Sequence, residues 1–400
     1  MPSKSSKENV SKDRIDKRTT KKKSLPFGCS SRFTVCIVFC ILCCVAVLTV
    51  TKWDVLSPKA IYEWFTFSAE NDGDFISSIS GTSILENNLQ TTEKGIIYVS
   101  DTSIVSLDYN GNKLFSSQHN FTNPLIKTSS AFSIAYNVGG SNYRIISNNE
   151  EIYRGTQGSS IVDCDITDSG IYCVISDQTG YLSILSVYDK ENNLIFSYSF
   201  NDYYALSVSL NESGTMAAVG ASNSVDGQLV SKVYLLDFSK TSPVSVYTYD
   251  DQIVYNVEFV SENTFAVVTD SLTSVIDCEK NKEIPYSYDT RVLTAYNISY
   301  NNCIVISLSR SDDGRECTMV SLDTDGNEVS SFATPHKIYA IDVNEDRIAY
   351  LAGNSLYLRN SYGDSFGEWE VGTDAKSVVL PQNKIAYILG VSEIRRVDLK

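Results

Sequence analysis

The sequence predicts an all-β fold, a single β-propeller preceded by one transmembrane helix. Two observations predict the propeller. A turn motif recurs at intervals of 37 to 48 residues, about the length of one propeller blade. The chain after residue 73 is also rich in Tyr, Val, Ile, Ser, Thr and Asn and has no long stretch of helical periodicity. A third observation, an uncharged stretch near the N-terminus, predicts the helix.

The uncharged stretch is Phe33–Thr51. It is long enough to cross a bilayer as a helix, because roughly 20 residues at about 1.5 Å each span about 30 Å. A cleaved signal peptide is the alternative, but the run exceeds the roughly 7 to 15 apolar residues of such signals. The sequence Val50-Thr51-Lys52-Trp53 also has no small-x-small cleavage site. We therefore expect an uncleaved anchor in the lipid bilayer.

The charges on the two sides of the span predict its orientation. Residues 1–32 contain ten Lys or Arg and three acidic residues, whereas residues 52–400 contain 23 basic and 45 acidic residues. Basic residues close to a span stay on the cytoplasmic side. We therefore expect a single-pass protein of the cell membrane with a basic cytoplasmic tail (1–32), a transmembrane helix (33–51), a stalk (52–73) and an extracytoplasmic propeller (74–400).

The clearest copies of the repeat are SLDYNGNKL, which starts at Ser106, and SLDTDGNEV, which starts at Ser321. Each has apolar residues, an Asp, a turn with Asn-Gly or Asp-Gly, and a second apolar run, which is the pattern of a β-hairpin. The Asp markers of the repeat are Asp108, Asp189, Asp237, Asp277, Asp323 and Asp398, and Asn148 and Asn360 take the same place in weaker copies. These eight markers predict eight repeats.

A second hairpin precedes most markers, as in IVDCDITDSGIYCVIS from Ile161 and ALSVSLNESGTMAAVG from Ala205. It joins an alternating strand to an apolar one through a polar tip, so each repeat has four strands. The eighth repeat lacks its fourth strand after Asp398. We expect the segment from Asp74 to Ile84 to supply it, because a closed ring leaves no unpaired edge. Eight blades are favoured, and seven result if the weak second repeat merges with a neighbour.

The residues that usually carry catalysis are scarce. The two histidines, His119 and His336, lie in connecting segments, and no motif has the spacing of a hydrolytic triad or a zinc site. The acidic turns at 312–314 and 323–328 could attract calcium, but turn chemistry accounts for their Asp and Gly residues. We therefore expect no catalytic, cofactor-binding or metal-binding residues, no cofactor and no enzyme activity.

Two cysteines of the predicted propeller fall in one hairpin. With a tip from Thr167 to Gly170, residues whose numbers sum to 337 face one another, so Cys164 lies opposite Cys173. Cross-strand neighbours can approach closely enough for a disulfide, although the geometry is demanding. A disulfide between Cys164 and Cys173 and a pair of buried free thiols both remain open.

Several segments resemble an uncharacterised family of membrane-anchored, WD40/TolB-like β-propeller proteins from Gram-positive anaerobic bacteria. The likeness is carried by FISSISG from Phe75, QHNFTNP from Gln118, AYNVGGSNY from Ala135 and the residues from Ile161 to Gly170. Members tend to have Pro after the Phe of the first segment, where this chain has Ile76. The resemblance implies a fold and a location and brings no activity.

Two classes of function follow from these features. In the first, the propeller is a binding platform for a protein, a peptide or a cell-wall ligand, which it meets at the membrane. In the second, it is an enzyme that acts on extracellular glycan through paired carboxylates. Carboxylates with raised pKa values that converge in the channel would favour the enzyme. Nucleic acid is not an expected partner, because the body carries a large net negative charge.

Overall fold

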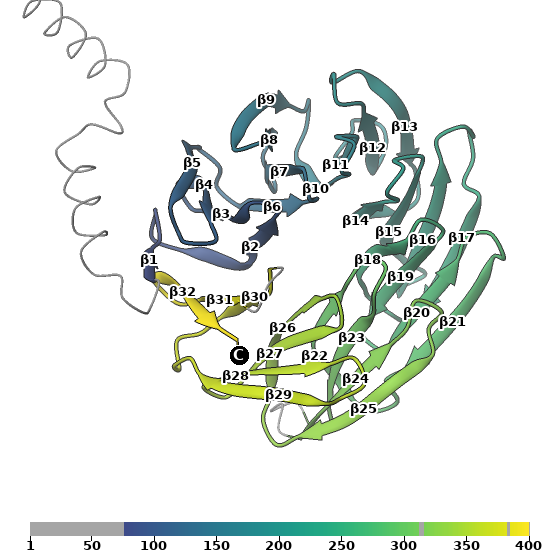
Figure 1. Ribbon diagram of the computed structural model, residues 1–400. Coiled ribbons are helices and arrows are strands. Elements are labelled where there is room, and N and C mark those ends of the chain that lie inside the picture. The colour runs from purple at the N-terminus through teal and green to yellow at the C-terminus, as the bar shows by residue number, and fades with distance from the viewer. Residues whose placement is uncertain (1–75, 312–315, 382–384, 400) are drawn as a thin grey trace, which may run out of the picture. The chain divides into compact units, whose positions relative to one another are not determined.

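The computed structural model describes residues 76–311, 316–381 and 385–399. The chain divides into two compact units, residues 1–72 and residues 73–400, and only the second contains described residues. It consists of eight four-stranded antiparallel sheets arranged as a ring (Figure 1). The predicted tail, span and stalk lie outside the described residues. Within the described part, no helix is long and apolar enough to cross a membrane.

Each sheet is one blade, and seven of the eight are built from four consecutive strands. Blades 1 to 4 comprise β2 (Ile84–Thr92), β3 (Gly95–Ser100), β4 (Ser103–Asp108) and β5 (Lys113–Gln118); β6 (Pro124–Thr128), β7 (Phe132–Asn137), β8 (Asn142–Ser147) and β9 (Glu150–Thr156); β10 (Ile161–Ile166), β11 (Tyr172–Ser176), β12 (Ser183–Tyr188) and β13 (Leu194–Phe200); and β14 (Tyr204–Leu210), β15 (Met216–Val225), β16 (Gln228–Asp237) and β17 (Ser245–Asp250).

Blades 5 to 8 comprise β18 (Val254–Ser261), β19 (Thr264–Thr269), β20 (Leu272–Asp277) and β21 (Lys282–Ser287); β22 (Val292–Ile298), β23 (Ile304–Ser309), β24 (Cys317–Leu322) and β25 (Glu328–Thr334); β26 (Ile338–Asn344), β27 (Arg347–Ala352), β28 (Ser355–Asn360) and β29 (Ser365–Glu370); and β30 (Ser377–Val379), β31 (Ile385–Leu389), β32 (Glu393–Asp398) and β1 (Ile76–Ser78).

The burial of each strand follows its place in the blade. The second strands are apolar runs, and β3 and β23 are buried along their whole length, because both faces of a blade pack against neighbouring blades. The outermost strands alternate between exposed and partly buried residues, as in β5 and β21. A hydrophobic cluster lies at each of the eight interfaces between blades. The ring is therefore closed, and its core is divided into eight parts.

Closure comes from the strand that the sequence predicted. β1 pairs antiparallel with β32, with Ser78 opposite Glu393, and becomes the outermost strand of blade 8. Blade 8 packs on blade 1 through buried residues that include Tyr387 and Ile394, and the Tyr387 hydroxyl donates to the backbone carbonyl of Tyr109 at 2.7 Å. Eight blades are confirmed, and the alternative of seven is wrong because the weak second repeat forms blade 2 by itself.

The Asp markers stand at the turn between the third and fourth strands of a blade. Asp108 accepts hydrogen bonds from the backbone N–H groups of Asn110 and Asn112, both at 2.8 Å, and Gly111 has a φ of 82°. Asp189, Asp323 and Asn360 make the equivalent bonds, and Asp237 and Asp277 accept from the backbone N–H two residues further on in turns of different geometry. Asp398 lies at the end of β32 and pairs with Arg396.

The predicted register of the Cys164 hairpin is wrong by one residue. Cys164 lies opposite Val174, and Cys173 lies opposite Asp165. The reason is Gly170, whose φ of 82° places an extra residue in the turn, so that Thr167 pairs with Ile171. The two side chains therefore point to opposite faces of blade 3, one toward blade 2 and the other toward blade 4. Both are buried free thiols.

The closing interface gives a test of the ring. Ile394 is fully buried between blades 8 and 1, so Ile394→Ala is expected to reduce the free energy of unfolding by about 3 kcal/mol and Ile394→Val by about 1 kcal/mol. Urea unfolding followed by circular dichroism measures both. A loss for Ile394→Ala below that of Ile394→Val would contradict a closed ring.

Candidate functional site

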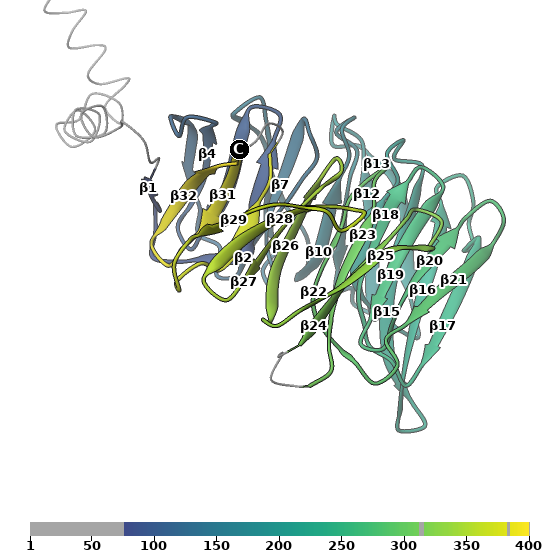
Figure 2. The ribbon, with the colours of Figure 1, turned by 60° about the horizontal axis from the view of Figure 1, so that its bottom comes forward.

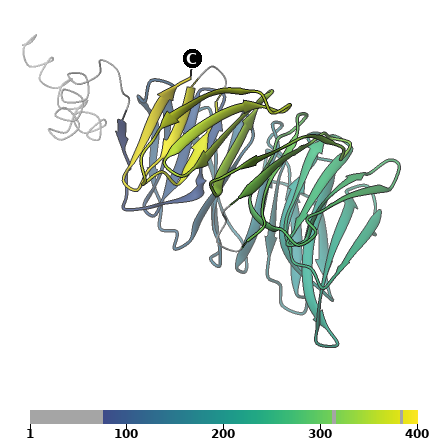
Figure 3. The same cartoon turned by 90° about the horizontal axis from the view of Figure 1, so that it is seen from below.

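The innermost strands of the blades surround the centre of the ring (Figure 1). Figure 3 shows the same ring from below. Each innermost strand pairs within its own sheet on one side only, so its other edge needs hydrogen-bond partners. Side chains of the preceding blade supply them. Asp163 and Asp165 of β10 accept from the backbone N–H groups of Val208 (2.9 Å) and Leu210 (2.7 Å) in β14.

The same arrangement recurs around the ring. Ser207 and Ser209 of β14 accept from backbone N–H groups of β18, both at 3.0 Å. Asn88 of β2 accepts from and donates to the backbone of β6, and Asp342 of β26 accepts from the N–H of Leu380 at 2.6 Å. The bonds advance in step along both partners, which shows that these strands run parallel. The polar side chains of the channel therefore join one blade to the next.

A lysine is part of this network. The Lys127 ammonium donates to Asp163 at 2.9 Å and to the carbonyl of Val208 at 3.1 Å, and the Tyr136 hydroxyl donates to Asp163 at 2.7 Å. Burial opposes the charge on Lys127, but the carboxylates of Asp163 and Asp165 outweigh it and raise the lysine pKa above its usual value. Lys127 therefore stays charged and neutralises part of the acidic centre.

Two further carboxyl groups of the innermost strands, those of Glu258 and Asp342, have pKa values close to neutral pH. Burial raises the pKa of Glu258 to about 7, with Asp165 adding to the shift and Lys127 opposing it. Burial also raises the pKa of Asp342 to about 7, although the Leu380 N–H lowers it. Asp163, Asp165 and Asp342 each accept a backbone N–H of the next blade, whereas Glu258 accepts from the side chain of Asn256 in its own strand, at 3.2 Å. Glu258 is therefore the channel carboxylate that contributes least to holding neighbouring blades together.

The beginnings of the inner strands carry β-bulges. In blades 3 to 7 the pairing of the first two strands skips one residue, and the skipped residues are Val162, Leu206, Tyr255, Thr294 and Tyr339. A bulge leaves its extra residue unpaired and can aim the side chain out of the regular pleat. Because parallel inner strands begin at the same end of the ring, these residues gather at one end of the ring, around its centre.

This end of the ring, which we call the channel mouth, exposes apolar side chains on three successive blades. Tyr204, Leu206, Ile253, Tyr255 and Val292 are each between 43 and 51% exposed. The hairpin between β15 and β16 extends beyond β14 at the same end, and Figure 2 shows it projecting past its neighbours.

The loops around the mouth are acidic. The exposed acidic residues of the segments beside it on blades 3 to 6 are Asp177, Asp202, Asp226, Asp251, Asp270 and Asp289. Two basic residues accompany them, the partly buried Arg291 and the exposed Arg310, which follows the partner of Val292. Solvent-exposed apolar residues within an acidic border are suited to contact a partner that carries both apolar and basic groups.

The structure places the residues singled out from sequence apart from one another. His119 is buried, with its Nε2 3.0 Å from the carbonyl of Ser100 and its Nδ1 accepting from the N–H of Phe121, whereas His336 is exposed on another blade. The turn at Asp323 is closed by its own backbone N–H groups, and the turn at 312–314 lies outside the described residues. Among described residues, no cluster of His, Cys, Asp and Glu is arranged to hold a metal ion.

One pattern in the sequence indicates the polar residues of the innermost strands. Polar residues two positions apart recur in the first strand of several repeats, as in Asp163/Asp165, Ser207/Ser209 and Asn256/Glu258. Residues two apart share one face of a strand, and here that face meets the channel. The bulged residues that form the mouth had no comparable signal, because a bulge depends on the partner strand.

Comparison with known proteins identifies a family and supports the fold. A model described as "Family of unknown function (DUF5711)" matches residues 73–399. Among solved structures, the chain is similar to BamB from Moraxella catarrhalis, with 11% identity over 80% of this chain and 99% of that chain and a TM-score of 0.52. It is also similar to the β-propeller domain of Cps50 (Swd1) from Myceliophteria thermophila, with 11% identity, 70% and 99% coverage and a TM-score of 0.44. No curated protein matches the sequence.

The raised pKa of Glu258 predicts a pH dependence of stability. The folded protein keeps a proton on Glu258 up to about pH 7, whereas the unfolded chain loses it near the ordinary glutamate pKa of 4.5. Stability from this group is therefore lost as the pH rises from about 4.5 to about 7. Glu258→Gln is expected to stabilise the protein at pH 8, by on the order of 1 kcal/mol, and much less at pH 4.5. Thermal unfolding at both values measures it, with the exposed Glu93→Gln as the control.

An equal effect of Glu258→Gln at both pH values would contradict the assignment. So would a similar pH-dependent gain for Glu93→Gln.

Proposed function

The chain belongs to the DUF5711 family of unknown function, and we propose that it is a membrane-tethered, extracytoplasmic binding platform for a protein or peptide. In this proposal the channel mouth is the recognition surface. The observation that carries the proposal is the set of exposed apolar residues on blades 4 to 6. Large apolar side chains normally avoid water, and a group of them on one surface is typical of an interaction site.

The position of these residues supports a recognition role. Leu206 and Tyr255 are the unpaired residues of bulges, so the backbone aims them outward while the residues beside them, Ala205 and Val254, stay buried. Tyrosine is among the residues that supply most binding energy at interfaces, since it offers a large area at low conformational cost. A rigid ring also presents them without reorganisation, which lowers the cost of binding.

The charges around the mouth limit the chemistry of the partner. With acidic residues on each side, a partner segment with Lys or Arg next to aliphatic or aromatic residues is favoured, and an acidic one is repelled. The same charge disfavours nucleic acid. A cell-wall glycan is compatible with the tyrosines but would not use the acidic border unless it carried positive charge.

The membrane location rests on the sequence. The uncharged run Phe33–Thr51 and the basic tail before it support an anchor with the propeller outside the cytoplasm. The resemblance to membrane-anchored propellers of Gram-positive anaerobic bacteria agrees with this arrangement. A tether keeps the mouth close to the membrane and raises its effective concentration toward partners there.

One observation favours the enzyme as a second candidate. Glu258 and Asp165, both with pKa values raised by burial, face the same centre. Asp165 accepts a backbone N–H of blade 4, which leaves Glu258 as the candidate acid. If the channel hydrolyses glycan, Glu258→Gln abolishes release of reducing sugar from cell-wall polysaccharide, whereas the binding platform predicts no release by either form.

Proximity labelling tests the mouth. The full-length chain carries a labelling enzyme at its C-terminus, and labelled neighbours are quantified by mass spectrometry. Tyr255→Ser or Leu206→Ser is expected to reduce labelling of specific partners about tenfold, because an anchoring side chain contributes on the order of 1.4 kcal/mol or more. The control is Leu194→Ser, which removes a leucine of similar exposure from the outermost strand of blade 3.

A basic, aromatic synthetic peptide provides the direct measurement. It is expected to bind the wild type and the Leu194→Ser variant alike, and to bind more weakly at high salt. Unchanged labelling and unchanged peptide binding in the Tyr255→Ser variant would overturn the assignment of the mouth.

Protease protection tests the location. When protease is added to intact cells, the propeller is expected to be cleaved or released and the 32-residue tail to remain protected. Epitope tags at both ends report the two outcomes. A C-terminal tag that survives in intact cells and disappears only after lysis would contradict the proposed orientation.

A further inference from the structure

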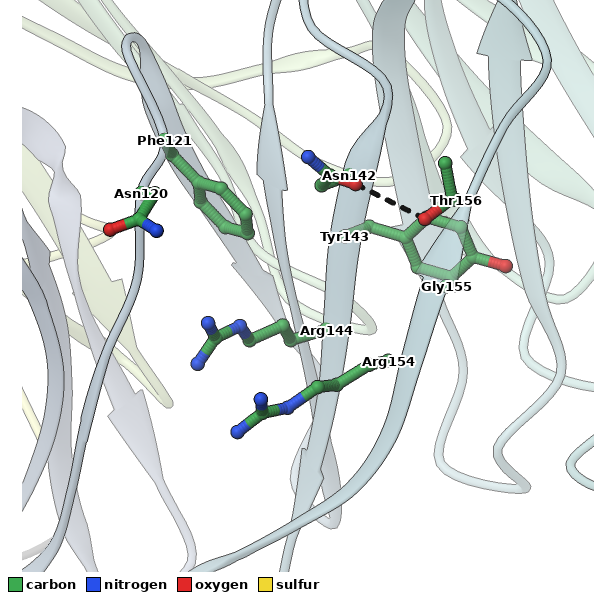
Figure 4. A pocket seen from close by; sticks show the side chains of 8 residues that line it. All are labelled: Asn120, Phe121, Asn142, Tyr143, Arg144, Arg154, Gly155 and Thr156. Carbon is green, nitrogen blue, oxygen red and sulfur yellow. Dashed lines mark hydrogen bonds between the residues drawn. The ribbon is translucent and has the colours of Figure 1, made fainter.

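Blade 2 has a pocket that is independent of the channel mouth. It has a volume of about 250 Å³ and is lined by Asn120, Phe121, Asn142, Tyr143, Arg144, Arg154, Gly155 and Thr156. Figure 4 shows the guanidinium groups of Arg144 and Arg154 extending in the same direction, toward the segment that carries Asn120 and Phe121. The two arginines are cross-strand partners in β8 and β9.

The charges in the pocket do not balance. Glu151 is the carboxylate that pairs with both arginines, through Oε2 with Arg144 at 2.9 Å and through Oε1 with Arg154. The Glu151 side chain is 11% exposed and also accepts from Ser117, so it has little capacity left. Two guanidinium groups against one carboxylate leave a net positive charge, in a body where acidic residues outnumber basic ones by 45 to 23.

The two arginines have different tasks. Arg144 is 12% exposed, donates to Ser117 and Glu151, and lies 5.7 Å from the centre of the Phe121 ring. It is therefore part of the wall. Arg154 is 69% exposed, and within the described residues only its Nε has a hydrogen-bond partner. Its two terminal nitrogens remain available to a ligand, in the planar geometry that suits an oxyanion.

The other walls offer neutral polar groups. The Thr156 hydroxyl donates to Asn142 Oδ1 at 3.1 Å, which leaves the Asn142 amide free to donate, and the exposed side chain of Asn120 stands opposite. The floor is fixed because Gly155 packs directly on the Tyr143 ring, and a Cβ there would come within 2.0 Å of it. This lining resembles the sites that bind hydroxylated molecules, since amides form several hydrogen bonds at once.

We propose that this pocket binds an oxyanion, a carboxylate or a phosphate, carried by a small hydroxylated molecule such as an acidic sugar. Arg154 would bind the anionic group, and the positive charge of Arg144 would attract it further. Asn120 and Asn142 would contact hydroxyl groups. The site lies on blade 2 and the mouth on blades 4 to 6, so the pocket does not depend on the function proposed for the mouth.

Isothermal titration calorimetry on the full-length chain in detergent tests the proposal. The probes are glucuronate, glycerol 1-phosphate, inorganic phosphate as an oxyanion without hydroxylated carbon, and, as a neutral control, glucose. Glucuronate or glycerol 1-phosphate is expected to bind, and the stronger of the two identifies the oxyanion. Glucose is expected to bind at least tenfold more weakly than the better anion. Arg154→Gln is expected to weaken that anion about tenfold, the effect of losing a charge-assisted hydrogen bond.

The control variant is Lys282→Gln, which removes an exposed positive charge from the outermost strand of blade 5 and is expected to bind as the wild type does. Asn142→Ala tests the neutral wall and is expected to weaken the sugar acid more than inorganic phosphate. Thermal unfolding shows that each variant is folded. Binding of glucose as strong as that of the better anion, no binding of either anion, or equal losses in Arg154→Gln and Lys282→Gln would overturn the proposal.

Discussion

The free edge of each innermost strand is the constraint on which this propeller depends. Four antiparallel strands satisfy their backbone groups everywhere except at the two edges of the sheet. The outer edge faces water, but the inner edges meet in the crowded centre of the ring. Asp163, Asp165, Ser207 and Asp342 accept the N–H groups that would otherwise lack partners there. Burial of acidic groups in the centre is therefore a consequence of how the ring is held together.

This requirement separates structural polar groups from functional ones. Most channel carboxylates are committed to the backbone of the next blade, and Lys127 compensates part of their charge. The residues free to meet a partner are those that the bulges move out of the strands, among them Leu206 and Tyr255. The bulge thus lets two parts of one strand have different roles. The buried part joins neighbouring blades, and the exposed beginning can contact a partner.

The blade count and the closing strand could be predicted because both follow from local signals. The Asp markers encode a turn with its own hydrogen bonds, and a missing fourth strand is visible as a gap in the repeat. The Cys164 register could not be predicted, because it depends on whether Gly170 counts as part of the strand or of the turn. The pocket on blade 2 was also missed, since Asn120, Asn142 and Arg154 are far apart in sequence and meet only after the blade has folded.

The division of the core into eight interfaces has a consequence for binding. Each of these hydrophobic clusters joins only neighbouring blades, so a substitution on the outer part of blade 2 and one on the outer part of blade 5 are expected to act additively. Near the centre of the ring this does not hold, because Lys127 of blade 2 bonds to Val208 of blade 4. A ligand in the pocket and a partner at the mouth would then bind without affecting each other, because a closed ring has no hinge to carry a change between them. A scaffold of this kind holds two recognition surfaces at a fixed separation. If one partner carried both a basic segment and an acidic sugar, simultaneous contact would strengthen binding through geometry alone.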